Sequence, residues 1–414
     1  MMKGGDIKRM KGGDIDMINF QEAQEMVLGR ARRFGTEEII LDGAFGRVLA
    51  EPIRADRDYP PFPRATMDGY ALRYVDLEQG IQRFRIVETL FAGSQAAARI
   101  GVGECYKIMT GAAVPEDANL VIRREDVEER EKEMEVGMKN PVAWRPWLNI
   151  ARQGEDLRAG ELVIDKPWRC DPAVMGLLAT LGKTTVTVAR GPEVGLITTG
   201  NEVVKSGSPV SPVQIRNSNH WMLSGALRRE HLGLRKYTHA GDDPEQLMRA
   251  LEGFLDLDVL ILTGGVSAGD ADHVPRVLTE LGIRPLFHKI AMRPGKPTWC
   301  GLLPSGGMVF ALPGNPFSCL VNFALLIAPY IHACWGLEQP PPISLPLHGE
   351  RKKRTPLDEF FPVRMEGTPA MLTQVPLNSS GDIRLGMGAN ALALHPAAIG
   401  DLGAGAEVAF YSFV

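Results

Sequence analysis

The fold of this chain is decided by three neighbouring stretches, DVLILTGGVSAGDADH (258–273), HKIAMRPGKP (288–297) and VFALPGNPFS (309–318). Val259 to Leu262 and Val309 to Leu312 are short apolar runs, and each leads into a loop that contains glycine or proline. Such runs predict buried strands of a sheet that is covered on both faces. Ligands of these sheets bind beyond the carboxyl ends of the strands, so the three loops are expected to share one rim.

The glycines of these loops point to an anionic ligand. Glycine lets the backbone approach a ligand closely, and free amides at a helix start favour an anion such as phosphate. A loop of this kind is as often a plain tight turn, and its place after a predicted strand favours binding. The expected contact residues on the rim are Thr263, Gly264, Gly265, Ser267, Gly269, Pro294, Gly295, Pro313, Gly314 and Asn315.

Five carboxylates follow predicted strands on the same rim, namely Glu202, Asp242, Asp243, Asp270 and Asp272. Converging carboxylates suit Mg²⁺, which takes few protein oxygens together with water and ligand phosphate. Helix capping is the alternative for Asp272 and Asp243, and Pro244 at the first helical position favours capping by Asp243.

Three cations, Lys289, Arg293 and Lys296, lie near the acidic loops. Two prolines stiffen their loop, and arginine and lysine suit phosphate or another oxyanion. A plain surface loop is the alternative. Three loops of the first half, around Asp68, Thr110 and Asp156, have the composition of binding segments or of simple turns.

Composition narrows the class of protein. The chain has 414 residues, 44% of them hydrophobic and 23% charged, which predicts two to four globular domains. A formal net charge of -4 gives no general reason to expect a nucleic acid or an acidic membrane partner. Five cysteines without CxxC spacing predict reduced thiols in the cytoplasm and no zinc site. The apolar run from Ser318 to Leu337 is expected to be a buried core helix.

The remainder of the chain changes texture several times. Residues 1–17 contain MKGGDI twice and are expected to be a flexible leader. Short segments punctuated by Gly and Pro after Ile53 predict a small β domain. Strands alternating with helices after Gly191 predict an open, doubly wound sheet. Short segments after Pro340-Pro341-Pro342 predict a β-barrel or sandwich.

Together these segments resemble the molybdopterin molybdenumtransferase family (MoeA type), which includes the gephyrin E domain. The likeness covers about residues 17 to 414, in the family's order, and the set of motifs is highly specific. The matching strings are ATMDGYAL at Ala65, MTGAAVP at Met109, NIARQGEDLRAG at Asn149, TTGNEVV at Thr198, QIRNSN at Gln214, TGGVSAGDADH at Thr263, KIAMRPGKP at Lys289 and ALPGNPFS at Ala311.

The resemblance implies a homodimer of four-domain subunits. The implied domains are a discontinuous N-terminal α/β domain at 18–52 and 149–190, an inserted small β domain at 53–148, an α/β molybdopterin-binding domain with an open doubly wound sheet at 191–338, and a C-terminal β-barrel at 339–414. It also implies a cytoplasmic enzyme that inserts molybdate into adenylylated molybdopterin, with Mg²⁺-dependent release of AMP. The implied partners are the adenylyltransferase that acts before it and the molybdoenzyme apoproteins that receive the product.

The resemblance also assigns residue roles. Asp68, Thr110 and Asp156 are the site residues carried over from the first half of the chain, and in the implied dimer Asp68 and Thr110 would act on the partner subunit's catalytic domain. The carboxylates carried over for the metal or phosphate site are Glu202, Asp242 and Asp272. The basic roles fall to Lys289, Arg293 and Lys296, and Pro297 and Ser318 are placed beside molybdate.

Several positions depart from the family pattern. Asn201 and Asn217 replace aspartates, Arg293 replaces the first lysine of KPGKP, and His273 replaces an aromatic residue. The R-x-E-F-x-R pattern, whose arginines help bind molybdate in the family, appears as LDEFFP at 357–362. Arg364 and Arg384 are the candidates to replace those arginines.

Two other functions stay open from the sequence. One is the preceding adenylyltransferase step, because the two enzymes share the α/β domain fold; the added β domains and the Asp68 loop favour the transferase. The other is a non-catalytic molybdopterin-binding or scaffold protein, which the missing arginines favour.

Overall fold

The computed structural model describes residues 17–136, 144–266 and 273–412. Its contacts divide the chain into two compact units. The first unit contains Met1–Ala50, Arg169–Asp171 and Thr187–Val414, and the second contains Glu51–Trp168 and Pro172–Val186. The expected leader at 1–17 lies outside the described residues except for its last residue.

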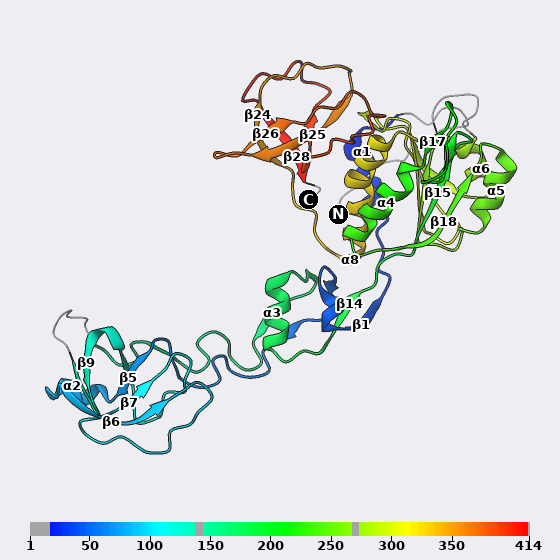
Figure 1. Ribbon diagram of the computed structural model, residues 1–414. Helices are drawn as coiled ribbons and strands as arrows, with labels where there is room; N and C mark the ends of the chain where they lie inside the picture. The colour runs from blue at the N-terminus through cyan, green and yellow to red at the C-terminus, as the bar shows by residue number, and fades with distance from the viewer. Residues whose placement is uncertain (1–16, 137–143, 267–272, 413–414) are drawn as a thin grey trace, which may run out of the picture. The chain divides into compact units, whose positions relative to one another are not determined.

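A six-stranded sheet forms the centre of the first unit (Figure 1). Its order is β18-β15-β19-β23-β22-β20; the first four strands are parallel, and β22 pairs antiparallel with both of its neighbours, β23 and β20. Both predicted apolar runs are strands, so the open, mixed α/β sheet is confirmed. The sequence did not predict β22. The strands are β15 (Val194–Thr199), β18 (Leu234–Ala240), β19 (Val259–Thr263), β20 (Arg284–His288), β22 (Trp299–Leu302) and β23 (Met308–Leu312).

Helices cover both faces of this sheet, as Figure 1 shows. Along β19, Val259 and Ile261 pack into one apolar core, and Leu260 and Leu262 pack into another. Alternation of side chains along a strand produces this division, and it explains why the run is apolar throughout. The first core is completed by α1 (Phe20–Leu28), α4 (Ser218–Arg229), α7 (Pro316–Asn322) and α8 (Ala328–Trp335), and the second by α5 (Pro244–Glu252) and α6 (Val274–Glu280).

Polar side chains start the helices where the sequence suggests. Asn19 and Glu22 form a capping box on α1, and the Asp243 carboxylate accepts a hydrogen bond from the Gln246 amide (2.9 Å) at the start of α5. The capping interpretation of Asp243 is therefore confirmed.

The helical piece expected near residues 46–50 was wrong. A 3₁₀ turn (Leu41–Ala44) leads instead to strand β2 (Val48–Leu49), which belongs to a sheet of order β1-β14-β2-β13. Gly46 has a φ of +74°, and the His231 ring fills the space that a Cβ would need there. A left-handed residue ends any helix at this point. The other strands of this sheet are β1 (Thr36–Ile40), β13 (Trp168–Arg169) and β14 (Thr185–Ala189).

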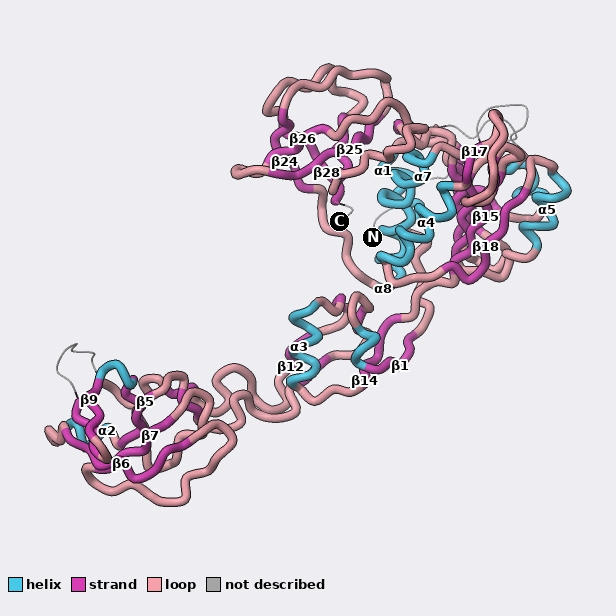
Figure 2. The backbone as a smooth tube through the Cα atoms, in the orientation of Figure 1, coloured by secondary structure: helices cyan, strands magenta, loops and turns pink. Residues whose placement is uncertain are grey.

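The C-terminal segment of the first unit is a closed barrel (Figure 2). Its strands run in the order β25-β26-β24-β28-β27, and pairing between β25 and β27 closes the ring. The strand β21 (Met292–Arg293) leads into the loop Pro294-Gly295-Lys296, called the PGK loop below, and adds to β25. The barrel strands are β24 (Ile343–His348), β25 (Asp358–Glu366), β26 (Met371–Gln374), β27 (Ala391–His395) and β28 (Glu407–Ser412).

The second unit is built on a six-stranded sheet of order β8-β5-β7-β6-β10-β9 (Figure 2). Tyr106 and Ile108 of β7 pack on one of its faces, and Cys105 packs on the other. Helices α2 (Tyr74–Glu78) and α3 (Pro172–Thr180) belong to the same unit. The sheet strands are β5 (Gly69–Leu72), β6 (Arg83–Leu90), β7 (Glu104–Ile108), β8 (Leu120–Arg123), β9 (Val127–Arg130) and β10 (Glu133–Val136); two short pairs are β3 (Ile53–Arg54) with β12 (Leu162–Ile164) and β4 (Arg64–Ala65) with β11 (Ile150–Ala151).

One helix among the described residues has the length and apolar character of a membrane span, Pro316–Trp335, and 72% of its most apolar window is buried inside the structure. It consists of α7, a π-helical turn (Phe323–Ile327) and α8. Its residues contribute to the first apolar core, as expected of a core helix.

All five cysteines are free and buried. Burial raises the pKa of the Cys170 thiol to about 11 and of the Cys105 thiol to about 12, and it also raises the pKa values of Cys300, Cys319 and Cys334. The thiols therefore stay protonated at neutral pH.

Candidate functional site

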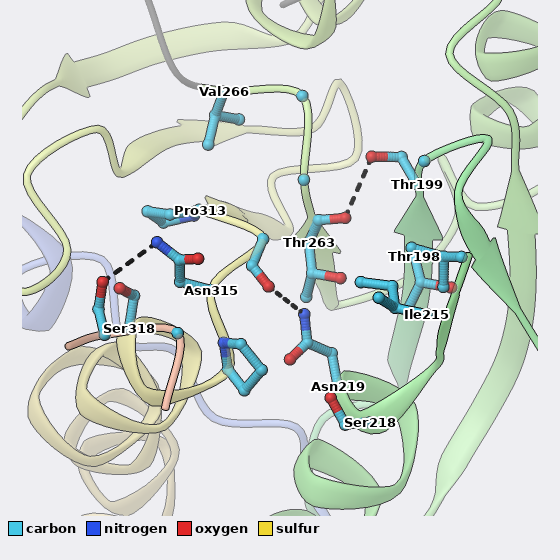
Figure 3. Close-up of a pocket in the computed structure, with 18 of the residues that line it drawn as sticks. Thr198, Thr199, Ile215, Ser218, Asn219, Thr263, Val266, Pro313, Asn315 and Ser318 are labelled. Carbon is cyan, nitrogen blue, oxygen red and sulfur yellow. Dashed lines mark hydrogen bonds between the residues drawn. The ribbon is translucent and has the colours of Figure 1, made fainter. Parts of the chain in front are cut away.

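A cavity of about 990 Å³ lies at the carboxyl ends of β15, β19 and β23. In Figure 3, Asn315 and Ser318 lie on one side of it, and Thr198, Thr199 and Ile215 lie on the other. The residues predicted from sequence that line it are Glu202, Asp242, Thr263, Gly264, Gly265, Arg293, Pro294, Gly295, Lys296, Pro297, Pro313, Gly314, Asn315 and Ser318. Ser267, Gly269, Asp270 and Asp272 lie outside the described residues.

The backbone after β19 turns sharply beside the cavity. Gly264 and Gly265 have φ values of +98° and +67°, which side-chain-bearing residues rarely adopt. The Thr199 hydroxyl donates to the Thr263 carbonyl (3.2 Å), and a Cβ on Gly264 would lie 2.4 Å from that hydroxyl oxygen. The glycine therefore allows two strand ends to approach at the rim.

The loop after β23 is held by contacts from three sides. Asn219 Nδ2 donates to the Gly314 carbonyl (2.8 Å), and Asn315 Nδ2 donates to the Ser380 hydroxyl (3.1 Å; Figure 3). The Cys319 thiol donates to the Pro313 carbonyl (3.0 Å). The start of α7, with the buried Ser318, is thus fixed at the cavity.

Two fully buried polar residues, Thr298 and Asn322, hold the PGK loop in place. The Thr298 hydroxyl lies 2.7 Å from the Gly295 carbonyl and 2.9 Å from Asn322 Oδ1. Asn322 Nδ2 donates to the Ser318 carbonyl (2.8 Å), so one side chain ties the PGK loop to the start of α7.

The braced loop presents unpaired positive charge. Arg293 and Lys296 are exposed and line the cavity. Neither side chain makes a hydrogen bond or ion pair with the described residues. Lys289 has a φ of +72° and is not among the lining residues. Two of the three predicted cations therefore face the same space.

Two predicted carboxylates, Glu202 and Asp242, also line the cavity. Asp242 Oδ2 accepts from the Asn201 amide (3.0 Å), and Asn201 Oδ1 accepts from the Asp242 amide (3.2 Å). Among the described residues there is no group of three or more His, Cys, Asp or Glu side chains that could hold a metal ion. The described part of the cavity therefore offers two carboxylates and open space beside them.

Comparison with known proteins bears on this arrangement. The family model for the MoeA N-terminal region (domain I and II) matches residues 18–182, and that for a probable molybdopterin binding domain matches residues 195–333. A molybdopterin molybdenumtransferase of Synechocystis sp. is 32% identical over 88% of this chain and 92% of its own length. The chain belongs to the molybdopterin molybdenumtransferase family. It is therefore a transferase of molybdenum cofactor biosynthesis.

Other members of the family agree in sequence and in fold. The molybdopterin molybdenumtransferase of Bacillus subtilis is 34% identical, over 78% of this chain and 76% of its own length. The crystal structure of the molybdopterin biosynthesis MoeA protein from Pyrococcus horikoshii OT3 is 27% identical, with a TM-score of 0.81 over 96% of this chain and 100% of that chain.

The family motif QIRNSN contributes more to the cavity than the sequence suggested. Asn217, which replaces the family's aspartate, is buried; its Nδ2 donates to the Thr198 hydroxyl (2.8 Å) and the Tyr237 hydroxyl (3.2 Å), and its Oδ1 accepts from the His220 amide. Gln214 and Ile215 line the cavity as well. The likeness of the motif to the family was the signal that would have identified these residues.

The barrel also reaches the cavity, through Leu357, Ser380, Gly381 and Ile383. Leu357 stands where the family has the first arginine of R-x-E-F-x-R. Neither candidate replacement lines this cavity: Arg384 pairs with Asp382 (2.6 Å), and Arg364 Nε donates to the Gly388 carbonyl (2.9 Å).

The second unit holds the other candidates. Asp68 Oδ1 accepts hydrogen bonds from both the amide and the hydroxyl of Thr110, each at 2.7 Å. Both hydrogen bonds lower the pKa of Asp68, and the one from the Thr110 amide has the larger effect. The Asp156 carboxylate lies 4.0 Å from Arg64 Nη2. Asp68 is thus a fixed, exposed carboxylate on this unit.

Proposed function

We propose that this chain inserts molybdate into adenylylated molybdopterin and releases AMP in a Mg²⁺-dependent reaction. The observation that supports the proposal is the combination around one cavity of two cations, Arg293 and Lys296, which pair with none of the described residues, and two carboxylates, Glu202 and Asp242. A substrate with a phosphoanhydride link and an oxyanion co-substrate both need positive charge. The carboxylates suit a cation that accompanies phosphate.

Glu202 and Asp242 are the described residues that would hold Mg²⁺, and Asp272 stays a proposed third ligand. When bound, the metal would neutralise phosphate charge during cleavage. The chain's own residues would bind the phosphates and compensate their charge. Gly264 and Gly265 let the backbone approach the phosphates, and Lys296 and Arg293 offset negative charge as AMP leaves. Pro297 and the buried Ser318, which line the same cavity, are the residues that we propose to contact molybdate.

Release of AMP from purified adenylylated molybdopterin, with Mg²⁺ and molybdate, tests the proposal directly. We expect AMP and active cofactor together; intact substrate after incubation would refute it. Lys296→Ala should lower kcat about 100-fold, the usual loss for one preorganised donor. Lys205, an exposed lysine outside the cavity lining, provides the matched control. Unmodified molybdopterin with ATP tests the adenylyltransferase alternative, and binding without turnover would indicate a scaffold.

We further propose four domains per subunit, with the boundaries given above, and a homodimer in which Asp68 and Thr110 act on the partner subunit's catalytic domain. Asp68→Asn and Lys296→Ala, each strongly impaired alone, would then complement. In a heterodimer of the two variants, one of the two composite sites has neither substitution. Co-expression in equal amounts should restore about a quarter of the wild-type sites, because about half of the dimers are mixed. Activity no higher than that of either variant would rule out the composite site.

A further inference from the structure

The start of α4 is attached to two separate parts of the cavity rim. Its N-cap Asn217 forms hydrogen bonds with side chains of β15 and β18, and Asn219, in the first turn, forms one with the loop after β23. In the sheet, β15 and β19 lie between β18 and β23. The first turn of α4 therefore links parts of the sheet that are three strands apart.

The side chain of Asn217 is buried, and its hydrogen-bonding groups are all used. Its Nδ2 donates to the hydroxyls of Thr198 (2.8 Å) and Tyr237 (3.2 Å), and its Oδ1 accepts from the His220 amide (3.1 Å). An amide group can donate two such hydrogen bonds, whereas the family's aspartate at this position only accepts. Two neighbouring strands thus fix the orientation of the residue that caps α4.

Two residues of β18, Tyr237 and His239, complete this attachment. His239 lies opposite Thr198 in the parallel strand pair, and its Nδ1 is 3.0 Å from the Thr198 hydroxyl. The Tyr237 ring stacks on the His220 ring of α4, with centroids 3.8 Å apart and planes 5° apart. Burial, and next the charge of Arg228, lower the pKa of His220, so the stacked imidazole is neutral at neutral pH. Tyr237 therefore contacts the start of α4 through its ring and through its hydroxyl.

The other attachment is a single hydrogen bond. Asn219 Nδ2 donates to the Gly314 carbonyl (2.8 Å; Figure 3), and Asn219 Oδ1 is buried without a hydrogen-bond partner among the described residues. Gly314 lies in the loop that leads into α7, where the Cys319 amide donates to the Asn315 carbonyl (3.1 Å). A displacement of the first turn of α4 would therefore also displace the start of α7.

We infer that Tyr237 is a positioning residue for the transferase reaction. Through Asn217 it holds the first turn of α4, and through Asn219 that turn fixes the loop after β23 relative to the ends of β15 and β19. His239 supports the same attachment through Thr198. The proposed phosphate contacts lie after β19 and the proposed molybdate contact Ser318 lies after β23, so the inference rests on the proposed function for the two ligands. Reaction between two bound groups depends steeply on their separation.

Steady-state AMP release by the full-length protein tests the inference. Tyr237→Phe keeps the ring on His220 and removes the hydroxyl. We expect kcat to fall about tenfold, with the KM of each substrate changed less than about threefold, because the contacts to each substrate remain. Thr198→Val should act in the same way, and Thr198→Ser, which keeps the hydroxyl, should restore kcat. A wild-type kcat in Tyr237→Phe, or a change confined to KM, overturns the inference.

The matched control is Thr238→Val, on the same strand. The Thr238 side chain alternates to the opposite face of the sheet and makes no hydrogen bond with the described residues. Its kinetics should match the wild type. Asn219→Ala removes the other attachment, so combining it with Tyr237→Phe should be no slower than the slower single variant. Multiplication of the two single effects overturns the inference.

Hydrogen exchange without substrate gives a readout that does not depend on turnover. Tyr237→Phe should speed exchange about tenfold in the first turn of α4 and also in the loop after β23 and the start of α7. Faster exchange confined to α4 overturns the inference. Faster exchange in both places, in a protein that releases no AMP, would remove the proposed function and leave the positioning of the loop by Tyr237 standing.

Discussion

Replacing Gly264 by alanine should damage both the stability of the first unit and its activity. Its φ of +98° makes any Cβ unfavourable by about 1–2 kcal/mol. The new Cβ would also lie 2.4 Å from the Thr199 hydroxyl oxygen, so that the hydrogen bond to the Thr263 carbonyl is lost at about 0.5–1.5 kcal/mol. The expected total is about 1.5–3.5 kcal/mol.

Gly207 gives the matched control. Its φ is +89°, but a Cβ there would meet no atom within 4 Å. Gly207→Ala should therefore show the backbone cost alone, about 1–2 kcal/mol. Urea unfolding followed by circular dichroism measures both variants, and AMP release measures function. We expect Gly264→Ala to lose about 100-fold in kcat/KM, because displacement of a rim loop misplaces the substrate. Equal unfolding free energies and equal activities in the two variants would refute the reasoning.

Three further predictions concern the buried Glu230, the helix cap Asn217 and the proposed Mg²⁺. The buried Glu230 carboxylate lies 2.7 Å from His332 Nε2 and 3.2 Å from Arg169 Nη2. Burial alone would raise the pKa of Glu230, but these two partners outweigh it and lower the pKa. The stabilisation by ionised Glu230 is therefore complete above about pH 4.3, and it is lost as the pH falls through the folded-state pKa. Thermal unfolding should accordingly show Glu230→Gln less stable than wild type at neutral pH, with the difference shrinking in acid; a constant difference contradicts this. Asn217→Asp keeps the cap on α4 but loses the donor to Thr198 and Tyr237, which should lower the unfolding free energy by about 1–2 kcal/mol in urea titrations. Chelation of Mg²⁺ by EDTA should stop AMP release and added Mg²⁺ should restore it, whereas turnover that persists in EDTA contradicts a metal requirement.

Much of the fold follows from local signals. β19 and β23 are apolar runs bounded by glycine or proline, and Asn19 and Asp243 each stand directly before their helix, so neighbouring residues specify each element. β22 could not be found this way. It contains Gly301 and pairs antiparallel with β20 and β23, and that pairing depends on segments remote in sequence.

The residues of the candidate site were likewise predictable only where a local sequence signal marks them. Loops at strand ends could be placed on one rim, because parallel strands bring their carboxyl ends together. The barrel residues Ser380 and Ile383 carry no motif, and only folding brings them to the rim.

The buried cysteines have a consequence for a substrate that carries sulfur. The dithiolene of the proposed substrate presents two sulfur atoms to molybdenum, and a reactive protein thiolate would compete for the metal or form a mixed disulfide. Here every cysteine is buried with a raised pKa, and the Cys319 thiol, directly beneath the cavity rim, is donating its proton to the Pro313 carbonyl. The five buried thiols would therefore leave the dithiolene of the proposed substrate without competition from protein cysteines for molybdenum.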